Sequence, residues 1–166
     1  MKSILLLQGS PTSLMDALVE QTCELAAALP HMESARVLER RVSPQGHVLI
    51  RQQWRLRVSV PALLRPHLED GLQDCVLTFE YRTGESLLQW RAESAALHAP
   101  GDVGGSLVFA TALGGRGSRV EWNCEVPIAN EALRTIIGAL LERQWRALLE
   151  AAAARVAAAR PAAPTG

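Results

Sequence analysis

The sequence has few cysteines and no run of apolar residues long enough to cross a membrane. Cys23, Cys75 and Cys124 are odd in number and far apart in a chain of 166 residues. Each stands among apolar residues, which is typical of small buried side chains in a reducing compartment rather than of disulfides or a metal site. Near the N-terminus only four apolar residues are consecutive, fewer than a secretion signal or a membrane span requires. We therefore expect a cytoplasmic protein with no integral membrane segment.

An excess of charge of one sign is also lacking. Lysine and arginine together number 17, and aspartate and glutamate together number 17. Without an overall positive field, we expect no nucleic acid partner. Arg51, Arg55 and Arg57 occupy alternate positions of one segment, so a surface that makes transient contact with a protein or a membrane stays open as an alternative.

Several catalytic motifs are missing. The sequence contains no glycine-rich phosphate loop, no His-Glu-x-x-His, no Cys-x-x-Cys and no Gly-x-Ser-x-Gly. The histidines fall in or beside expected loops or on an outer strand face, and no cysteine or serine nucleophile is placed beside them. They are His31, His47, His67 and His98. We therefore expect no metal site, no catalytic residues of these classes and no cofactor.

The longest pattern that is present predicts an amphipathic helix from about Asn130 to Ala157. Its apolar residues recur at spacings of three, four and seven, with charged residues on the opposite face. Asn130 suits an N-cap, and Glu131 places negative charge in the first turn. About 27 residues at ~1.5 Å each give ~40 Å, enough to cross a small sheet. The apolar stripe consists of Leu133, Ile136, Ile137, Leu140, Leu141, Leu148 and Ala152.

Upstream of this helix, the sequence predicts one strand, two short helices and six further strands. An apolar run at 4–8 predicts the first strand, and Ser10 followed by Pro11 marks a helix start. The apolar pattern up to Leu29 fits two short helices with a bend at 21–24. Alternating apolar and polar residues predict strands at 35–42, 47–60, 75–82, 87–93, 107–113 and 119–128. Strands with one apolar face each and one long helix predict an α+β fold, with the helix lying on a curved sheet.

This order of elements resembles the START-like (SRPBCC) helix-grip superfamily, which includes polyketide cyclases, coenzyme-Q-binding proteins and birch-pollen-allergen-like proteins. The resemblance covers residues 3–157 and includes Ser10-Pro11 after the first strand, Gly-Ser-Arg-Val-Glu-Trp at 117–122 and the closing helix. It implies a seven-stranded antiparallel sheet curved around the C-terminal helix, with a ligand cavity between them. We expect a single domain at 1–157 and a flexible Ala/Pro tail at 158–166.

The apolar faces of the expected strands and helix carry the candidate ligand site. Aromatic side chains share those faces with aliphatic ones, and Gln52 and Gln144 place one amide each on the interior side. A buried amide without a hydrogen-bond partner costs about 1–3 kcal/mol. We therefore expect the amide of each glutamine to bond to the other glutamine, to water or to a ligand. A structural and a ligand-facing role are equally open for this pair. The expected ligand contacts are Gln52, Trp54, Phe79, Tyr81, Trp90, Thr111, Trp122, Leu140 and Gln144.

Such a cavity favours the binding or transport of a small hydrophobic molecule, such as a lipid, an isoprenoid quinone or a polyketide-like compound. The alternatives are a polyketide cyclase or dehydratase type of enzyme and a protein-interaction module without a ligand. Tyr81 is the only expected cavity residue that could transfer protons, and its usual pKa of ~10 suits neutral pH poorly, so we favour a non-catalytic protein. We also expect residues 62–74, helped by 100–105, to form a lid at the entrance.

Overall fold

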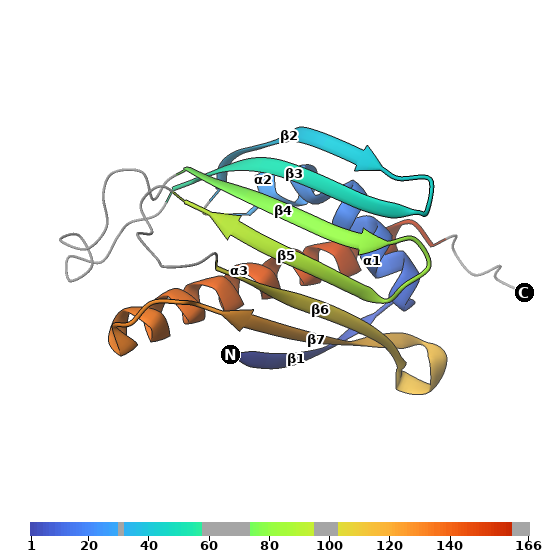
Figure 1. The fold of residues 1–166 in the computed structure, drawn as a ribbon. Helices are drawn as coiled ribbons and strands as arrows, with labels where there is room; N and C mark the ends of the chain where they lie inside the picture. The colour runs from blue at the N-terminus through green and yellow to red at the C-terminus, as the bar shows by residue number, and fades with distance from the viewer. Residues whose placement is uncertain (30–31, 58–73, 95–102, 161–166) are drawn as a thin grey trace, which may run out of the picture.

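The computed structural model describes residues 1–29, 32–57, 74–94 and 103–160, and its elements follow in the expected order (Figure 1). The α+β prediction, with seven strands, two short helices after the first strand and a long C-terminal helix, is confirmed. The elements are β1 (Lys2–Gln8), α1 (Pro11–Glu20), α2 (Thr22–Ala27), β2 (Met32–Val42), β3 (His47–Leu56), β4 (Asp74–Arg82), β5 (Leu87–Glu93), β6 (Val103–Ala112), the 3-10 helix η3 (Leu113–Gly115), β7 (Gly117–Glu125) and α3 (Glu131–Ala158).

All seven strands form one antiparallel sheet in the order β1-β7-β6-β5-β4-β3-β2. The first strand pairs with the last, so β1 and β2 are the two edges. The three α-helices lie on one side of the curved sheet, and α3 runs along that side (Figure 1). Inward-facing residues of the central strands, such as Phe79 and Leu107, are fully buried in the core beneath the helices.

Local sequence signals start the helices where they were expected. The Ser10 hydroxyl oxygen accepts a hydrogen bond from the Ser13 N–H at 3.2 Å, and Pro11 occupies the first turn of α1. The Asn130 Oδ1 accepts one from the Leu133 N–H at 3.0 Å. These bonds satisfy N–H groups that a helix start leaves free. Gln21 separates α1 from α2, where the bend was predicted.

Strand β6 begins earlier than the sequence predicted. Residues 103–105 were expected in a loop, but Gly104 and Gly105 pair with Arg91 and Trp90 in the ladder to β5. Glycine is depleted in strands, which is why the pair resembled a loop. The structure gives Gly105 a packing reason, because a Cβ there would overlap the backbone carbonyl oxygen of Asn123 on β7.

The buried face of α3 is centred on Trp145, which is not part of the apolar stripe that the sequence predicts. Residues of α3 that are buried are Gly138, Trp145, Leu148, Leu149 and Ala152. Leu140, expected to face the interior, is 44% exposed. At ~100° per residue, five residues place Leu140 about 140° around the helix from Trp145. Of the predicted stripe, Leu148 and Ala152 are buried and Ile137 and Leu141 pack against the core. The buried face is therefore rotated from the predicted stripe by about one residue, and Gln144 lies at its edge, half-buried.

Parts of two predictions fall outside the described residues. Of the expected lid, only Asp74 and 103–105 are described, in β4 and β6. Of the expected tail, 158–160 is described, at and just after the end of α3. Within the described ranges, no helix is both long enough and apolar enough to cross a membrane.

Candidate functional site

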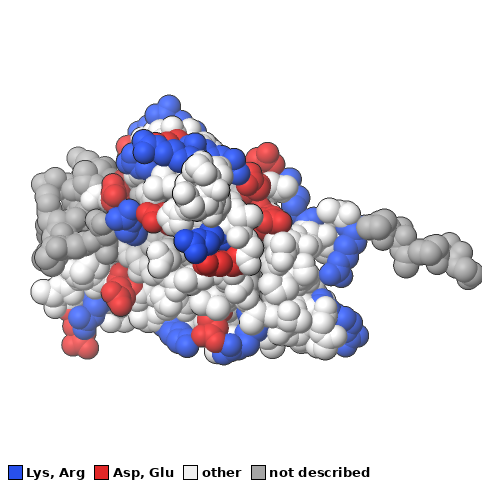
Figure 2. Space-filling model, turned by 45° about the vertical axis from the view of Figure 1, so that its right-hand side comes forward, with Lys and Arg blue, Asp and Glu red and all other residues white. Residues whose placement is uncertain are grey.

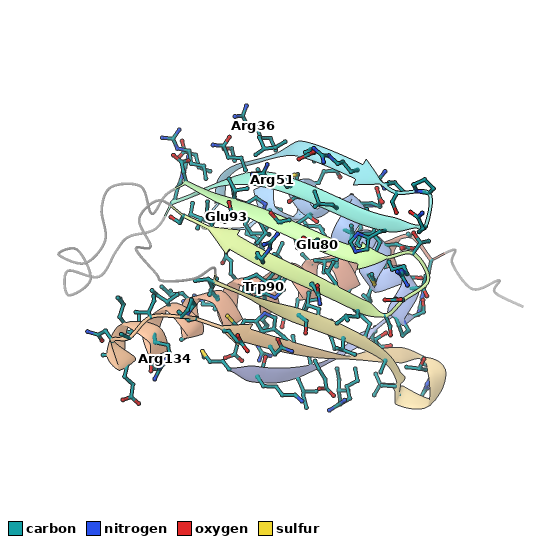
Figure 3. The ribbon with its side chains drawn as sticks, in the orientation of Figure 1. Arg36, Arg51, Glu80, Trp90, Glu93 and Arg134 are labelled. Carbon is teal, nitrogen blue, oxygen red and sulfur yellow. The ribbon has the colours of Figure 1, made fainter. Side chains whose placement is uncertain are left out.

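Four aromatic side chains, which we call the aromatic cluster, meet between α3 and the middle of the sheet. Phe79, Trp90 and Trp122 come from β4, β5 and β7, and Trp145 comes from α3; all four are at most 4% exposed. The ring centroid of Trp145 lies 5.9 Å from that of Phe79 and 5.1 Å from that of Trp90. Trp90 and Trp122 stack at 6.4 Å with an interplanar angle of 11°. Figure 3 labels Trp90 at the middle of the sheet.

Gly105 lies next to this cluster on β6, directly between Trp90 on β5 and Cys124 on β7. The three atoms nearest to a Cβ placed at this position belong to the backbone of Asn123 and Cys124. The close approach of β7 is therefore what requires a glycine here.

Several buried polar atoms around the aromatic cluster have no hydrogen-bond partner. Among the described residues, these atoms include the Nε1 of Trp90, the Nε1 of Trp122 and the Nε2 of Gln144. The Ser3 hydroxyl, whose residue pairs with Trp122 in the β1–β7 ladder, is buried and unpartnered as well. An unsatisfied buried donor costs about 1–3 kcal/mol. Buried polar groups without a partner are rare in native proteins, so each of these groups calls for a specific explanation.

Gln52, the other glutamine of the predicted pair, has a hydrogen-bond partner, unlike the Nε2 of Gln144. Gln52 is buried, and its Oε1 accepts a hydrogen bond from the Nε1 of Trp54 at 2.9 Å. The two residues are two positions apart on β3, so their side chains leave the same face of the strand. The amide oxygen of Gln52 is thus engaged within the protein, whereas the amide nitrogen of Gln144 is not.

Besides Leu140, two of the predicted contacts do not lie where they were expected. Thr111 is exposed. It lies on the same side of β6 as the buried Leu107 and Phe109, but it is one residue from the end of the strand, where the core no longer covers it. Tyr81 is half-buried and lines a separate pocket beside α1. Trp145 was missed by the sequence analysis, although its spacings of four from Leu141 and three from Leu148 were visible in the sequence.

The titratable groups of the inner face are poorly suited to catalysis. Burial, more than the nearby Glu20, raises the pKa of the Tyr81 hydroxyl. Burial also raises the pKa of the Cys75 and Cys124 thiols to about 11 in both cases. These groups stay protonated and neutral at pH 7, so none of them serves as a base or a thiolate nucleophile. No group of three potential metal ligands is found among the described residues.

Two of the three outer arginines, Arg51 and Arg55, are paired with carboxylates. Arg51 lies 3.8 Å from Glu39, and Arg55 lies 3.6 Å from Glu33, with Asp74 a further neighbour of Arg55. Acidic side chains lie among the basic ones on the face seen in Figure 2. Exposed pairs of this kind contribute little energy and leave no strong positive field. This balance weakens the alternative of an interaction module that acts through these arginines.

A hollow of about 540 Å³ opens on the outer face of the sheet. It forms where Gly104 and Ser106 lack large side chains, between Arg91 on β5 and Asn123 and Glu125 on β7. Its lining is mainly polar and charged, although Trp90 also contributes to it. It is therefore unsuited to the apolar ligand that the sequence predicts.

No protein-family model matches the sequence, and no curated protein matches it. Solved structures, however, match almost the whole chain. The Zhui aromatase/cyclase from Streptomyces sp. R1128 is 15% identical, with a TM-score of 0.64 over 99% of this chain and 96% of that one. Ara h 8.0201 is 12% identical, with a TM-score of 0.65 over 95% and 97%. A START superfamily protein from Mycobacterium smegmatis is 12% identical, with a TM-score of 0.58 over 96% and 98%. The chain therefore has the START-like helix-grip fold that its sequence resembles.

Proposed function

We propose that this protein binds a small, mainly apolar molecule that carries hydrogen-bond acceptors, against the aromatic cluster between α3 and the sheet. The observation that carries this proposal is the set of buried donors without acceptors on Trp90 and Trp122 of the aromatic cluster and on Gln144, the residue before Trp145. Small-molecule sites are mostly apolar, with a few polar groups that orient the ligand. Aromatic quinones and polyketide-like carbonyl compounds have both properties.

The chemistry of the unpartnered groups favours acceptors over donors. An indole N–H only donates, and the Nε2 of an amide only donates. A ligand carbonyl placed at Trp90 or Trp122 would remove the cost of an unsatisfied donor, and its flat ring could stack on an indole. Gln144 would add a third donor from α3. Trp54 and Phe79 stay proposed as apolar wall, and Gln52 as a further polar contact.

Non-catalytic binding is favoured over the cyclase or dehydratase alternative. One structure of this fold is an aromatase/cyclase. Proton transfer, however, needs an acid or base whose pKa lies near the working pH. Burial moves the pKa of Tyr81, Cys75 and Cys124 upward, away from neutral pH. Among the described inner-face residues, these changes favour a carrier or sensor.

Replacing Gln144 with leucine tests the proposed polar contact. The probes are 2-methyl-1,4-naphthoquinone, which has two carbonyl acceptors, and 2-methylnaphthalene, which has none. We expect Gln144→Leu to weaken quinone binding by about 1–2 kcal/mol and to leave hydrocarbon binding unchanged. Stability should stay equal or rise, because an unsatisfied buried amide is replaced by an apolar group of similar size. Tryptophan emission reports binding, and urea unfolding reports stability.

Gln89→Leu is the matched control for this substitution, because Gln89 is exposed on the outer face of β5. It should change neither the affinity for the quinone nor the affinity for the hydrocarbon. If Gln144→Leu lost stability and kept its quinone affinity, Gln144 would be a structural residue and not a ligand contact.

A further inference from the structure

A second pocket, of about 480 Å³, lies at the end of the sheet beside α1. Its walls come from α1, from β2, β3 and β4 near the two hairpin turns, and from the β4–β5 turn. Figure 1 shows α1 beside these strand ends, whereas the N-terminal half of α3 lies towards the opposite end of the sheet. A pocket of this size falls in the range that small molecules occupy.

The floor of this α1 pocket is apolar. Val42, Val48 and Tyr81 pair across β2, β3 and β4, so they form one row on the inner face of the sheet. Met15 of α1 faces this row from the other wall, and both Met15 and Val48 are buried. Val42, by contrast, is 55% exposed. The row therefore contains apolar surface that the described protein leaves uncovered and that a ligand could cover.

The rim of the α1 pocket is negatively charged. Asp16, Glu20 and Glu85 contribute three carboxylates and Arg40 one guanidinium, so the lining itself has a net charge of −2 (three minus one). Glu85 is offset by Arg82, which lies outside the lining and 3.7 Å from it. Arg40 forms an ion pair with Glu20, in which the Arg40 Nη2 lies 2.7 Å from the Glu20 Oε1. Asp16 has no ion-pair or hydrogen-bond partner among the described residues. Burial is the main cause of the raised pKa of Tyr81; the charges of Glu20 and Asp16 raise this pKa further, and Arg40 lowers it.

We propose that the α1 pocket binds an organic cation with a short apolar body, such as an arylalkyl amine. The ammonium group would lie at Asp16, within reach of the ring of Tyr81, where carboxylate attraction and cation–π attraction act together. The apolar body would cover Val42 and Val48. This site is separate from the aromatic cluster and needs no ligand there.

The test uses three probes with the same phenyl ring: 2-phenylethylamine, 2-phenylethanol and 3-phenylpropionate. NMR of the Met15 and Val42 methyl groups in the full chain reports occupancy. We expect the amine to bind about tenfold more tightly than the alcohol, and the carboxylate to bind more weakly than either. Added salt should weaken the amine and leave the alcohol unchanged, because salt screens exposed charges.

Two exposed substitutions locate the site. Asp16→Asn should weaken the amine about fivefold and leave the alcohol unchanged, since it removes a charge and keeps the shape. Val42→Lys should abolish amine binding, because it places a cation on the pocket floor. Gln144→Leu should leave amine affinity unchanged, which separates this site from the aromatic cluster. Equal affinity for amine and alcohol, or an unchanged amine affinity in Asp16→Asn, would overturn the proposal.

Discussion

A chain that ends at Glu142 is expected not to fold. The missing part of α3 supplies Trp145, Leu148, Leu149 and Ala152, none of which is more than 4% exposed in the native protein. Burial of each large apolar side chain contributes about 1.5–3 kcal/mol, against a total stability of about 5–15 kcal/mol for a whole domain. Losing three such side chains at once removes most of that margin. Circular dichroism and thermal melting would measure the loss.

A second truncation controls for the effect of shortening the chain. A chain that ends at Ala157 should melt like the parent, because the described residues that it loses, 158–160, are all exposed. If the chain ending at Glu142 also melted like the parent, α3 would not be the element on which the sheet packs.

Trp145→Ala is expected to cost about 3–5 kcal/mol of unfolding free energy, whereas Leu140→Ala should cost less than about 1 kcal/mol. The difference follows from the rotation of α3. Trp145 contacts the rings of Phe79 and Trp90, while Leu140 is 44% exposed. Urea unfolding with an unchanged m-value would measure both costs on one scale. Both substitutions introduce alanine into the same helix. A gain in helix propensity is therefore common to both variants and does not explain a difference between their unfolding free energies.

The opposite order of costs would overturn the assignment of the buried face. A larger loss in Leu140→Ala would mean that α3 turns the leucine-rich stripe towards the sheet, as the sequence predicted. Gln144 would then lie at the centre of the buried face, and the aromatic cluster would lack its helical member.

The fold could be predicted because its elements are encoded locally. Ser10 and Asn130 accept hydrogen bonds from N–H groups three residues ahead, so each helix start depends on neighbours in sequence. Alternation placed Trp54, Phe79, Trp90 and Trp122 on one side of the sheet, and all four are buried. Period-two alternation determines the side on which a strand residue lies, provided that the strand is recognised.

The phase of α3 and the start of β6 could not be predicted in the same way, because contacts between distant segments decide them. Two apolar stripes overlap on α3, one through Leu133, Ile137 and Leu140 and the other through Gly138, Trp145 and Ala152. Hydrophobicity alone does not choose between them. The ring contacts of Trp145 belong to the second stripe. Similarly, Gly105 lies in a strand because β7 passes close to it, which no neighbour in sequence reveals.

The roles of Gln52 and Gln144 could not be predicted from the sequence either. In sequence both were amides on an interior face, with structural and ligand-facing roles equally open. In the structure the Oε1 of Gln52 accepts from Trp54, while the Nε2 of Gln144 has no partner. Only the packing of side chains from different elements distinguishes them.

The most direct test of ligand binding at the aromatic cluster is an NMR titration of the four indole N–H groups with 2-methyl-1,4-naphthoquinone. The chain has four tryptophans, so each signal can be assigned by substitution. The N–H of Trp54 provides a comparison, because its Nε1 already donates to Gln52 and needs no acceptor from the ligand. We predict that the N–H signals of Trp90 and Trp122 move downfield as they acquire an acceptor, and that the signal of Trp54 shows no comparable downfield move. Unchanged Trp90 and Trp122 signals in the presence of bound quinone would contradict the proposed site.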